Sequence, residues 1–161
     1  MIDDDAAKQA AGLLWKAWRT AGTLAALPEA CRPDSRADGY RIQSELLALA
    51  GRGWGWKIAA TSVAGQRHIG VDGPLGGRIF ADRIHAPGDT VSLAGNRMRV
   101  AEVEFAFRIG RTLEPRDAPW RSGELLEAVD ALLPSIEIPD SRFEPCARAG
   151  APQLIADNAC A

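Results

Sequence analysis

Apolar residues in the first fifty positions recur at the spacing of amphipathic helices. Between residues 6 and 21 they fall three or four positions apart, so they share one face of a helix. The aspartates at positions 3–5 suit the positively polarised start of such a helix, and Gly22 ends it. A second helix is predicted from residue 34 or 35 to residue 50, with Gly51 as its stop.

After the second helix the pattern changes to short apolar runs bounded by glycine and proline, which is typical of strands and turns. Strands are predicted over residues 54–60, 78–80, 90–93, 97–109 and 135–138. One more helix is predicted over residues 120–133, ended by Pro134. Helices followed by a sheet predict an α+β fold. We expect a single domain (1–161), helical over residues 1–50 and built on a sheet over residues 51–161.

Three carboxylates lie inside apolar, strand-like runs, where a charged group is costly to bury. Glu102 and Glu104 are two residues apart, so their side chains leave a strand on the same face, about 7 Å apart. Glu137 lies between two isoleucines in the last predicted strand. The alternate positions on the first of these strands are expected to face the core, and they are Val103, Phe105, Phe107 and Ile109.

Two like charges on one strand face repel each other unless a cation lies between them. A divalent metal held by Glu102 and Glu104, with Glu137 as a third oxygen ligand, would remove that repulsion. Three carboxylates without a nitrogen or sulfur ligand favour Mg²⁺ or Mn²⁺. The alternative is a solvated strand face, with glutamate on the wet side and apolar residues on the dry side.

Several other polar residues have both a functional and a structural interpretation. Lys57 interrupts an apolar strand, where it could bind an anionic substrate, act as an acid or base, or extend along the strand edge to water. Asp72 lies in a glycine-rich segment and suits a turn. Asp140 and Arg142 could pair with each other, and residues 157–158 could form a turn or support a neighbouring site.

Composition and charge argue against several classes of partner. The chain has 47% hydrophobic and 25% charged residues and a net charge of −2, with no basic block, so nucleic acid and anionic membranes are not expected partners. No apolar run approaches the roughly 18 residues that span a bilayer, and the acidic start lacks the features of a signal peptide. Three scattered cysteines predict reduced thiols in a cytoplasmic protein.

Six stretches, in this order, resemble the 2-keto-4-pentenoate hydratase branch of the fumarylacetoacetate hydrolase superfamily. They are residues 38–43 (DGYRIQ), 55–62 (GWKIAATS), 70–74 (GVDGP), 102–107 (EVEFAF), 134–142 (PSIEIPDSR) and 155–159 (IADNA). Each stretch alone is weak, but six in register cover nearly the whole chain and are fairly specific.

The resemblance implies a mixed β-roll, an oligomer of identical chains, and Mg²⁺ or Mn²⁺ held by Glu102, Glu104 and Glu137. It places the active-site lysine of the family at Lys57. The implied substrates are small 2-oxo or 2-hydroxydienoic acids from the degradation of aromatic compounds. The implied reaction is the metal-dependent addition of water to a 2-hydroxypenta-2,4-dienoate, which makes the protein a lyase.

The resemblance also covers four further positions outside the metal site. Ser62 and Arg142 lie in matched stretches and are expected to contact the substrate. The family often has an acidic residue just after the Gly-Val-Asp turn, where this chain has Leu75, so Asp72 is the substitute candidate for the acid or base. The family continues into glycine-rich strands beyond the last matched stretch, so the roll is expected to be incomplete in this chain.

Two alternatives to the hydratase remain open on the sequence. A 2-oxo-acid decarboxylase of the 4-oxalocrotonate type, from the same branch, would use the same metal chemistry and release CO₂. A non-catalytic fragment, or a subunit that needs a partner chain, would carry the same carboxylates without turnover.

Overall fold

The computed structural model describes residues 1–160, which form two compact units. The first unit contains Met1–Arg99 and the segment that begins at Pro139, and the second contains Val100–Ile138. Most of the helices belong to the first unit, and a long hairpin makes up most of the second. Within residues 1–160 no helix combines the length and the apolar character that crossing a bilayer requires.

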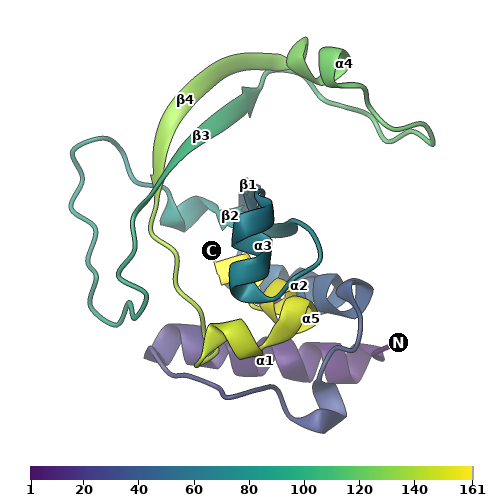
Figure 1. Cartoon of the computed structure of the whole chain (residues 1–161), viewed down its shortest axis with the longest axis vertical. Coiled ribbons are helices and arrows are strands. Elements are labelled where there is room, and N and C mark those ends of the chain that lie inside the picture. Colours follow the sequence, from purple (N-terminus) through teal and green to yellow (C-terminus); the bar gives the residue numbers. More distant parts are fainter. Residues whose placement is uncertain (161) are drawn as a thin grey trace. The chain divides into compact units, whose positions relative to one another are not determined.

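Three helices pack together in the first unit, with one of them in contact with both others (Figure 1). They are α1 (Asp4–Thr20), α2 (Arg36–Ala50) and α5 (Gly150–Ala156). The bounds of α1 and α2 confirm the two helices predicted from the sequence. Both begin at side-chain caps: Asp3 accepts a hydrogen bond from the backbone N–H of Ala6, and Ser35 from that of Asp38.

The core of the first unit lies between these helices. Its fully buried large side chains include Leu14, Leu27, Ile42, Leu46, Leu154 and Ile155. Gly39 lets α2 approach α5 closely, because a Cβ at this position would lie 2.4 Å from the carbonyl oxygen of Pro152. The packing of the two helices therefore depends on the absence of a side chain at Gly39.

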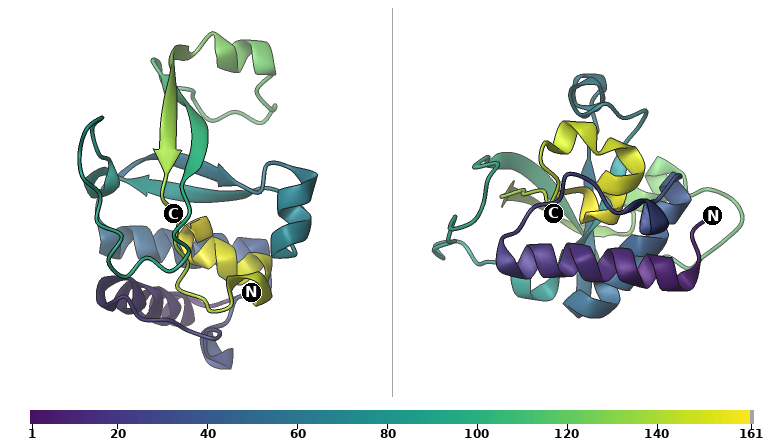
Figure 2. Two further views of the ribbon diagram at one scale, coloured as in Figure 1. Left: turned by 60° about the vertical axis from the view of Figure 1, so that its left-hand side comes forward. Right: turned by 90° about the horizontal axis from the view of Figure 1, so that it is seen from below.

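Strands β1 (Gly53–Ala59) and β2 (Leu75–Phe80) form a two-stranded antiparallel sheet and lie side by side in Figure 2. Lys57 faces Gly77 in the register of this sheet. Helix α3 (Val63–Ile69) connects the strands. The sequence did not predict α3, because seven residues are too few to show a helical period. Single turns of 3₁₀ helix form at Glu29–Cys31, Ala81–Arg83, Cys146–Arg148 and Asn158–Cys160.

The second unit is an antiparallel hairpin of β3 (Glu102–Ile109) and β4 (Val129–Glu137) (Figure 1). A short helix, α4 (Ser122–Leu126), lies in the connection between the strands. Across the described chain the sheets are thus two antiparallel pairs, β1 with β2 and β3 with β4.

The helix predicted over residues 120–133 is wrong in its second half, because β4 begins at Val129. Pairing with β3 gives the backbone of this apolar run its hydrogen-bond partners, and that pairing outweighs the helical spacing of its leucines. Pro134 does not end a helix but lies inside β4, opposite Phe105. A proline is tolerated there because β4 pairs on one side only. The strand predicted at residues 90–93 is also wrong, since these residues form a loop.

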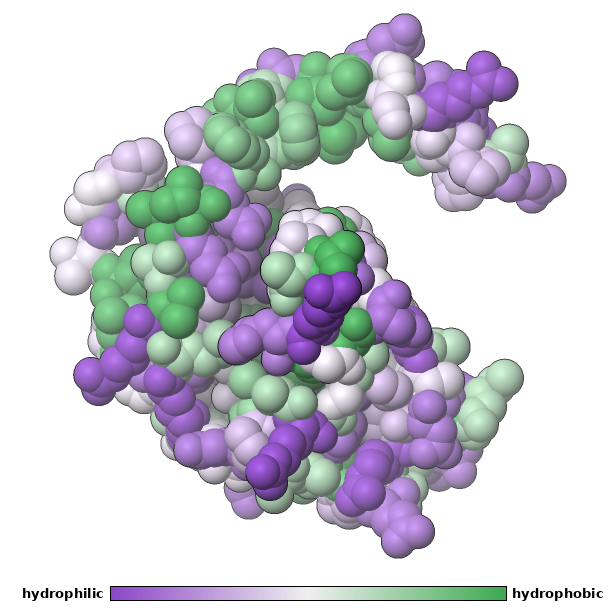
Figure 3. Space-filling view, viewed as in Figure 1, coloured by the Kyte–Doolittle hydropathy of each residue, from purple (hydrophilic) through white to green (hydrophobic). Residues whose placement is uncertain are grey.

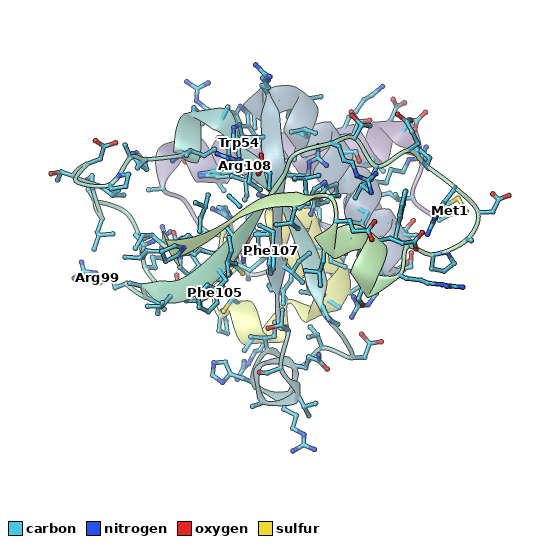
Figure 4. The ribbon with its side chains drawn as sticks, turned by 90° about the horizontal axis from the view of Figure 1, so that it is seen from above. Met1, Trp54, Arg99, Phe105, Phe107 and Arg108 are labelled. Carbon is cyan, nitrogen blue, oxygen red and sulfur yellow. The ribbon has the colours of Figure 1, made fainter. Side chains whose placement is uncertain are left out.

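One face of the hairpin is apolar and open to solvent in the described chain. Val103 is 87% exposed, Phe105 is 72% exposed and Ile136 is 70% exposed. Phe105 and Phe107 both belong to β3 (Figure 4), and apolar side chains follow the hairpin in the space-filling view (Figure 3). The prediction that this face belongs to the core is therefore wrong within residues 1–160, because the two-stranded hairpin has no second layer in its own unit.

The connection between β3 and β4 is held by an ion pair on an aromatic ring. The guanidinium of Arg116 donates hydrogen bonds to both carboxylate oxygens of Glu124, at 2.9 and 2.7 Å, and lies 3.7 Å from the ring centre of Trp120. The backbone N–H of Arg121 donates to the same carboxylate at 2.8 Å. These groups favour the ionised form, and they lower the pKa of Glu124 to about 2.

We expect the Glu124 carboxyl to titrate near pH 2 in the folded chain, and the Arg116→Gln substitution to move its pKa up toward 4.5. Because the folded pKa is lowered, the stabilisation from this pair is present above about pH 4.5 and is lost as the pH falls toward 2. A ¹³C NMR titration of the side-chain carboxyl measures the pKa. The matched control is Arg111→Gln, since Arg111 is the smallest of the contributions that lower it. An equal shift in both variants would contradict the assignment to Arg116.

Candidate metal centre and lysine site

Three glutamates converge at the open end of the β3–β4 hairpin. Glu102 opens β3 and faces Glu137, the last residue of β4, directly across the ladder. Glu104 is two residues along β3, so its side chain leaves the same face of the strand. One carboxylate oxygen from each residue lies within 4.8 Å of the other two. The register of the hairpin thus brings together all three carboxylates that the sequence predicts as metal ligands.

The geometry of this cluster fits a hard divalent cation. Two oxygens that bind the same ion are at most two bond lengths apart, which is about 4.2 Å for Mg²⁺ and about 5 Å for Ca²⁺. The oxygens of the cluster lie within 4.8 Å of one another, which is inside this limit for Ca²⁺ and slightly beyond it for Mg²⁺. Glu104 and Glu137 are half-buried and Glu102 is exposed, so the cluster keeps an open side.

The donor set contains only oxygen. The two histidines, His68 and His85, and the three cysteines all lie outside the hairpin, in the first unit. Carboxylates alone suit Mg²⁺, Mn²⁺ or Ca²⁺ and not the softer ions that prefer imidazole or thiolate. Three anionic groups this close also repel one another, and a bound cation would relieve that repulsion.

Lys57 is half-buried in the middle of β1. Its ammonium Nζ donates a hydrogen bond to the carbonyl oxygen of Ala159 at 2.9 Å. The side chain therefore follows the inside of the first unit toward the turn after α5 and does not extend along an exposed strand edge.

Asp72 lies in the turn before β2 and pairs with Arg36, which begins α2. Arg36 also donates to the carbonyl oxygens of Gly73 at 3.2 Å and Pro74 at 2.9 Å. The hydrogen bond from Arg36 lowers the pKa of the exposed Asp72 carboxyl. These contacts match the turn interpretation, while the predicted acid or base role of Asp72 stays a prediction.

Ser62 caps helix α3, where its hydroxyl oxygen accepts a hydrogen bond from the backbone N–H of Gly65 at 3.0 Å. The side chain is exposed at this helix start. The structure therefore gives Ser62 a local structural role, and its predicted contact with substrate stays a prediction.

Arg142 is buried together with Asp157 in the first unit. Its Nε donates to one oxygen of the Asp157 carboxylate at 2.5 Å, and its backbone N–H donates to the other at 2.8 Å. The hydroxyl of Ser141 donates to that second oxygen at 2.8 Å, and the Arg142 guanidinium lies 4.5 Å from the ring centre of Trp18. Burial raises the pKa of the Asp157 carboxyl, and the charge and hydrogen bonds of Arg142 oppose that rise.

The pairing of Arg142 with Asp140 that the sequence allows is therefore wrong. Asp140 instead accepts backbone hydrogen bonds from Arg97 at 3.0 Å and Met98 at 3.2 Å. The sequence does not predict Asp157 as the partner of Arg142, because neither the residue types nor the spacing of fifteen residues indicates a contact. A contact of Arg142 with substrate stays a prediction.

No model of a known protein family matches the chain. The solved structure of 4-oxalocrotonate decarboxylase from Pseudomonas putida G7, complexed with magnesium and adipate, superposes with a TM-score of 0.83 at 22% identity, over 100% of this chain and 62% of that one. A second structure of that enzyme, complexed with calcium and acetate, gives a TM-score of 0.80 at 21% identity. The chain thus has the fold of this class of enzymes, which confirms the predicted fold.

Sequence relatives narrow the class. The 2-keto-4-pentenoate hydratase of Paraburkholderia xenovorans (strain LB400) is 32% identical over 140 residues, which are 84% of this chain and 51% of that enzyme. The 2-keto-4-pentenoate hydratase 2 of Dechloromonas aromatica (strain RCB) is 34% identical over 149 residues, 89% of this chain and 56% of that enzyme. The chain is related to the 2-keto-4-pentenoate hydratases, as its six matched stretches predict. It spans about half the length of these relatives.

Proposed function

We propose that this chain carries the metal-binding part of a hydratase, a lyase that adds water to a 2-hydroxypenta-2,4-dienoate in the degradation of aromatic compounds. The observation that carries the proposal is the convergence of Glu102, Glu104 and Glu137 at one end of the hairpin. The names of the sequence relatives supply the reaction class. Mg²⁺ or Mn²⁺ is the proposed ion, and the magnesium bound to the decarboxylase of the same fold supports that choice.

The proposed chemistry assigns a role to each group. A divalent cation held by the three glutamates would supply positive charge to stabilise the oxyanion that develops on the 2-oxo substrate. Glu102, Glu104 and Glu137 fix the position of that charge. Lys57 would hold the substrate carboxylate or move a proton. Asp72 as acid or base, and Ser62 and Arg142 as substrate contacts, complete the proposal.

We further propose that the protein acts in the cytoplasm as an oligomer of identical chains. All three cysteines are free thiols, which suits a reducing compartment. The exposed apolar face of the hairpin suits contact with another polypeptide surface.

A 2-oxo-acid decarboxylase is the second candidate function. A 4-oxalocrotonate decarboxylase from Pseudomonas sp. is 34% identical over 105 residues, which are 65% of this chain and 40% of that enzyme. Decarboxylation and hydration would both begin with the same charge stabilisation on the 2-oxygen. The products separate them, because only the decarboxylase releases CO₂.

We expect turnover of 2-hydroxypenta-2,4-dienoate to require Mg²⁺ or Mn²⁺ and to be abolished by Glu102→Gln, because one of three charged ligands is lost. The assay follows the ultraviolet absorbance of the dienoate and, in parallel, CO₂ release from 4-oxalocrotonate. Glu114→Gln is the matched control, since Glu114 is exposed in the same unit and lies outside the cluster. Equal turnover in Glu102→Gln would contradict the metal assignment. Turnover of neither substrate at any metal concentration would favour the non-catalytic alternative.

A further inference from the structure

Three consecutive residues after α5 have a left-handed backbone although none is glycine. The φ angles are 59° at Asn158, 54° at Ala159 and 66° at Cys160. A side chain makes this conformation unfavourable, and a run of three is unusual. Such a segment persists only where surrounding contacts hold it in place, and such segments gather at functional sites.

The amide of Asn158 fastens this turn to strand β2. Its Oδ1 accepts a hydrogen bond from the backbone N–H of Arg78 at 2.6 Å, and its Nδ2 donates to the carbonyl oxygen of Arg78 at 2.9 Å. Further along the turn, the carbonyl oxygen of Cys160 accepts from the backbone N–H of Asp140 at 3.0 Å. Asn158 is fully buried, so these two-point contacts are shielded from water.

Gly77 makes the space in which the turn and the lysine meet. A Cβ at this position would lie 2.3 Å from the carbonyl oxygen of Asn158, and 3.0 and 3.1 Å from Cγ and Cδ of Lys57. Gly77 faces Lys57 directly across the sheet. Any other residue at position 77 would push the turn away from β2 and the lysine out of its path.

The carbonyl oxygen of Ala159, in the middle of the turn, receives the ammonium of Lys57 at 2.9 Å. The left-handed backbone at Ala159 and its neighbours therefore determines where this acceptor lies. Cys160 does not supply an opposing charge, because burial raises the pKa of its thiol to about 12. The neutral carbonyl of Ala159 is thus the acceptor that the turn provides to Lys57.

We propose that Gly77 and Asn158 are positioning residues for Lys57: together they hold the turn at 158–160 so that the Ala159 carbonyl fixes the lysine ammonium. The part that this plays in turnover rests on the proposed function of Lys57. We call this arrangement of Gly77, Asn158 and the Ala159 carbonyl around Lys57 the lysine clamp. The clamp lies within the first unit, and it can be tested without any substrate.

The number of lysines makes the test direct. The chain has three, Lys8, Lys16 and Lys57, and the first two are exposed on α1. We expect ¹⁵N NMR of the lysine side chains in the full chain to show one ammonium with slow hydrogen exchange, from Lys57. Lys8 and Lys16 serve as internal references for fast exchange.

Two substitutions remove the clamp in different ways, and a third is the matched control. Asn158→Gly keeps a residue that accepts left-handed backbone but loses both hydrogen bonds to Arg78, and Gly77→Ala displaces the turn and Lys57 together. Either should speed the exchange of the Lys57 ammonium about tenfold or more, as expected for loss of a charged hydrogen bond. Ala159→Gly keeps the carbonyl and relieves strain, so it should leave the exchange slow. A thermal scan of each variant reports whether it is folded.

Two results would overturn the clamp. One is Lys57 exchange as fast as that of Lys8 and Lys16 in the unsubstituted chain. The other is slow Lys57 exchange that survives in Asn158→Gly. If Gly77→Ala does not fold, Asn158→Gly and Ala159→Gly still decide. Turnover is measured separately, and kcat should fall in Asn158→Gly. An inactive unsubstituted chain with slow Lys57 exchange would contradict the proposed function and leave the clamp supported.

Discussion

Mn²⁺ is expected to raise the thermal unfolding midpoint of the 161-residue chain, and Glu102→Gln is expected to remove that rise. An ion that binds only the folded hairpin stabilises it by mass action, by about 2.7 kcal/mol at a hundred times its dissociation constant. For a chain of this size that corresponds to about 5 to 10 °C. Loss of a directly bound carboxylate should weaken Mn²⁺ binding by more than about 100-fold. Even groups that only hydrogen-bond to the metal ligands change metal affinity by about 10 to 100-fold when they are substituted.

Without metal the same substitution should have the opposite sign. Glu102 faces Glu137 directly in the strand register, with Glu104 nearby, so the folded hairpin holds three like charges together. Glu102→Gln removes one of them and should stabilise the metal-free chain by about 0.2 to 1 kcal/mol. If the three glutamates form only a solvated strand face, Glu102→Gln should still stabilise the metal-free chain, but Mn²⁺ should not raise the unfolding midpoint.

The measurements are a thermal scan with and without Mn²⁺ and an electron paramagnetic resonance titration of free Mn²⁺. The control is again Glu114→Gln, which changes the net charge equally and leaves the cluster intact. An unfolding midpoint that does not change with Mn²⁺, or that rises equally in Glu102→Gln, would contradict the metal centre. It would also contradict the proposed hydratase chemistry, which depends on that centre.

Arg142→Met is expected to destabilise the first unit by about 3 to 5 kcal/mol, because it leaves the buried carboxylate of Asp157 without its counter-charge. The side chains of the pair are only 5% and 1% exposed. Urea unfolding followed by circular dichroism measures the loss. The double variant Arg142→Met with Asp157→Leu should recover most of it, since burying no charge avoids the cost of an unpaired one.

The matched control for this pair is Arg108→Met. Arg108 pairs with Asp130 at 2.8 Å on the hairpin, but these side chains are 58% and 46% exposed. Water and salt screen such a pair, so its loss should cost far less stability than the loss of Arg142. If Arg142→Met costs no more than Arg108→Met, the buried pair is not structural, and the predicted contact of Arg142 with substrate gains weight.

The sequence by itself determined the elements whose signals are local. Helices α1 and α2 follow from their apolar spacing and from the caps Asp3 and Ser35, which act within three residues of their own position. The shared face of Glu102 and Glu104 follows from the two-residue period of a strand. The six matched stretches identified the relatives, because motif order along a chain needs no knowledge of contacts.

Only the tertiary structure decided the features that depend on pairing between distant segments. It placed Glu137 opposite Glu102 and gave Arg142 the partner Asp157. It also extended the strand predicted at residues 135–138 back to Val129. It also left the apolar face of β3 exposed, where alternation predicts core, since alternation identifies an apolar face but not what covers it.

The lysine clamp shows the same division. Lys57, Gly77 and Asn158 are ordinary residues in sequence, separated by up to 101 positions. Their relation arises when the turn after α5 lies against β2. The missing Cβ of Gly77 leaves room for the methylene groups of Lys57, the Asn158 amide binds the backbone of Arg78, and the carbonyl of Ala159 accepts from the lysine ammonium. The local sequence pattern determines which residues share a face of a helix or strand. Strand register and the close approach of distant segments determine which groups come into contact, and both depend on the packing of the whole unit.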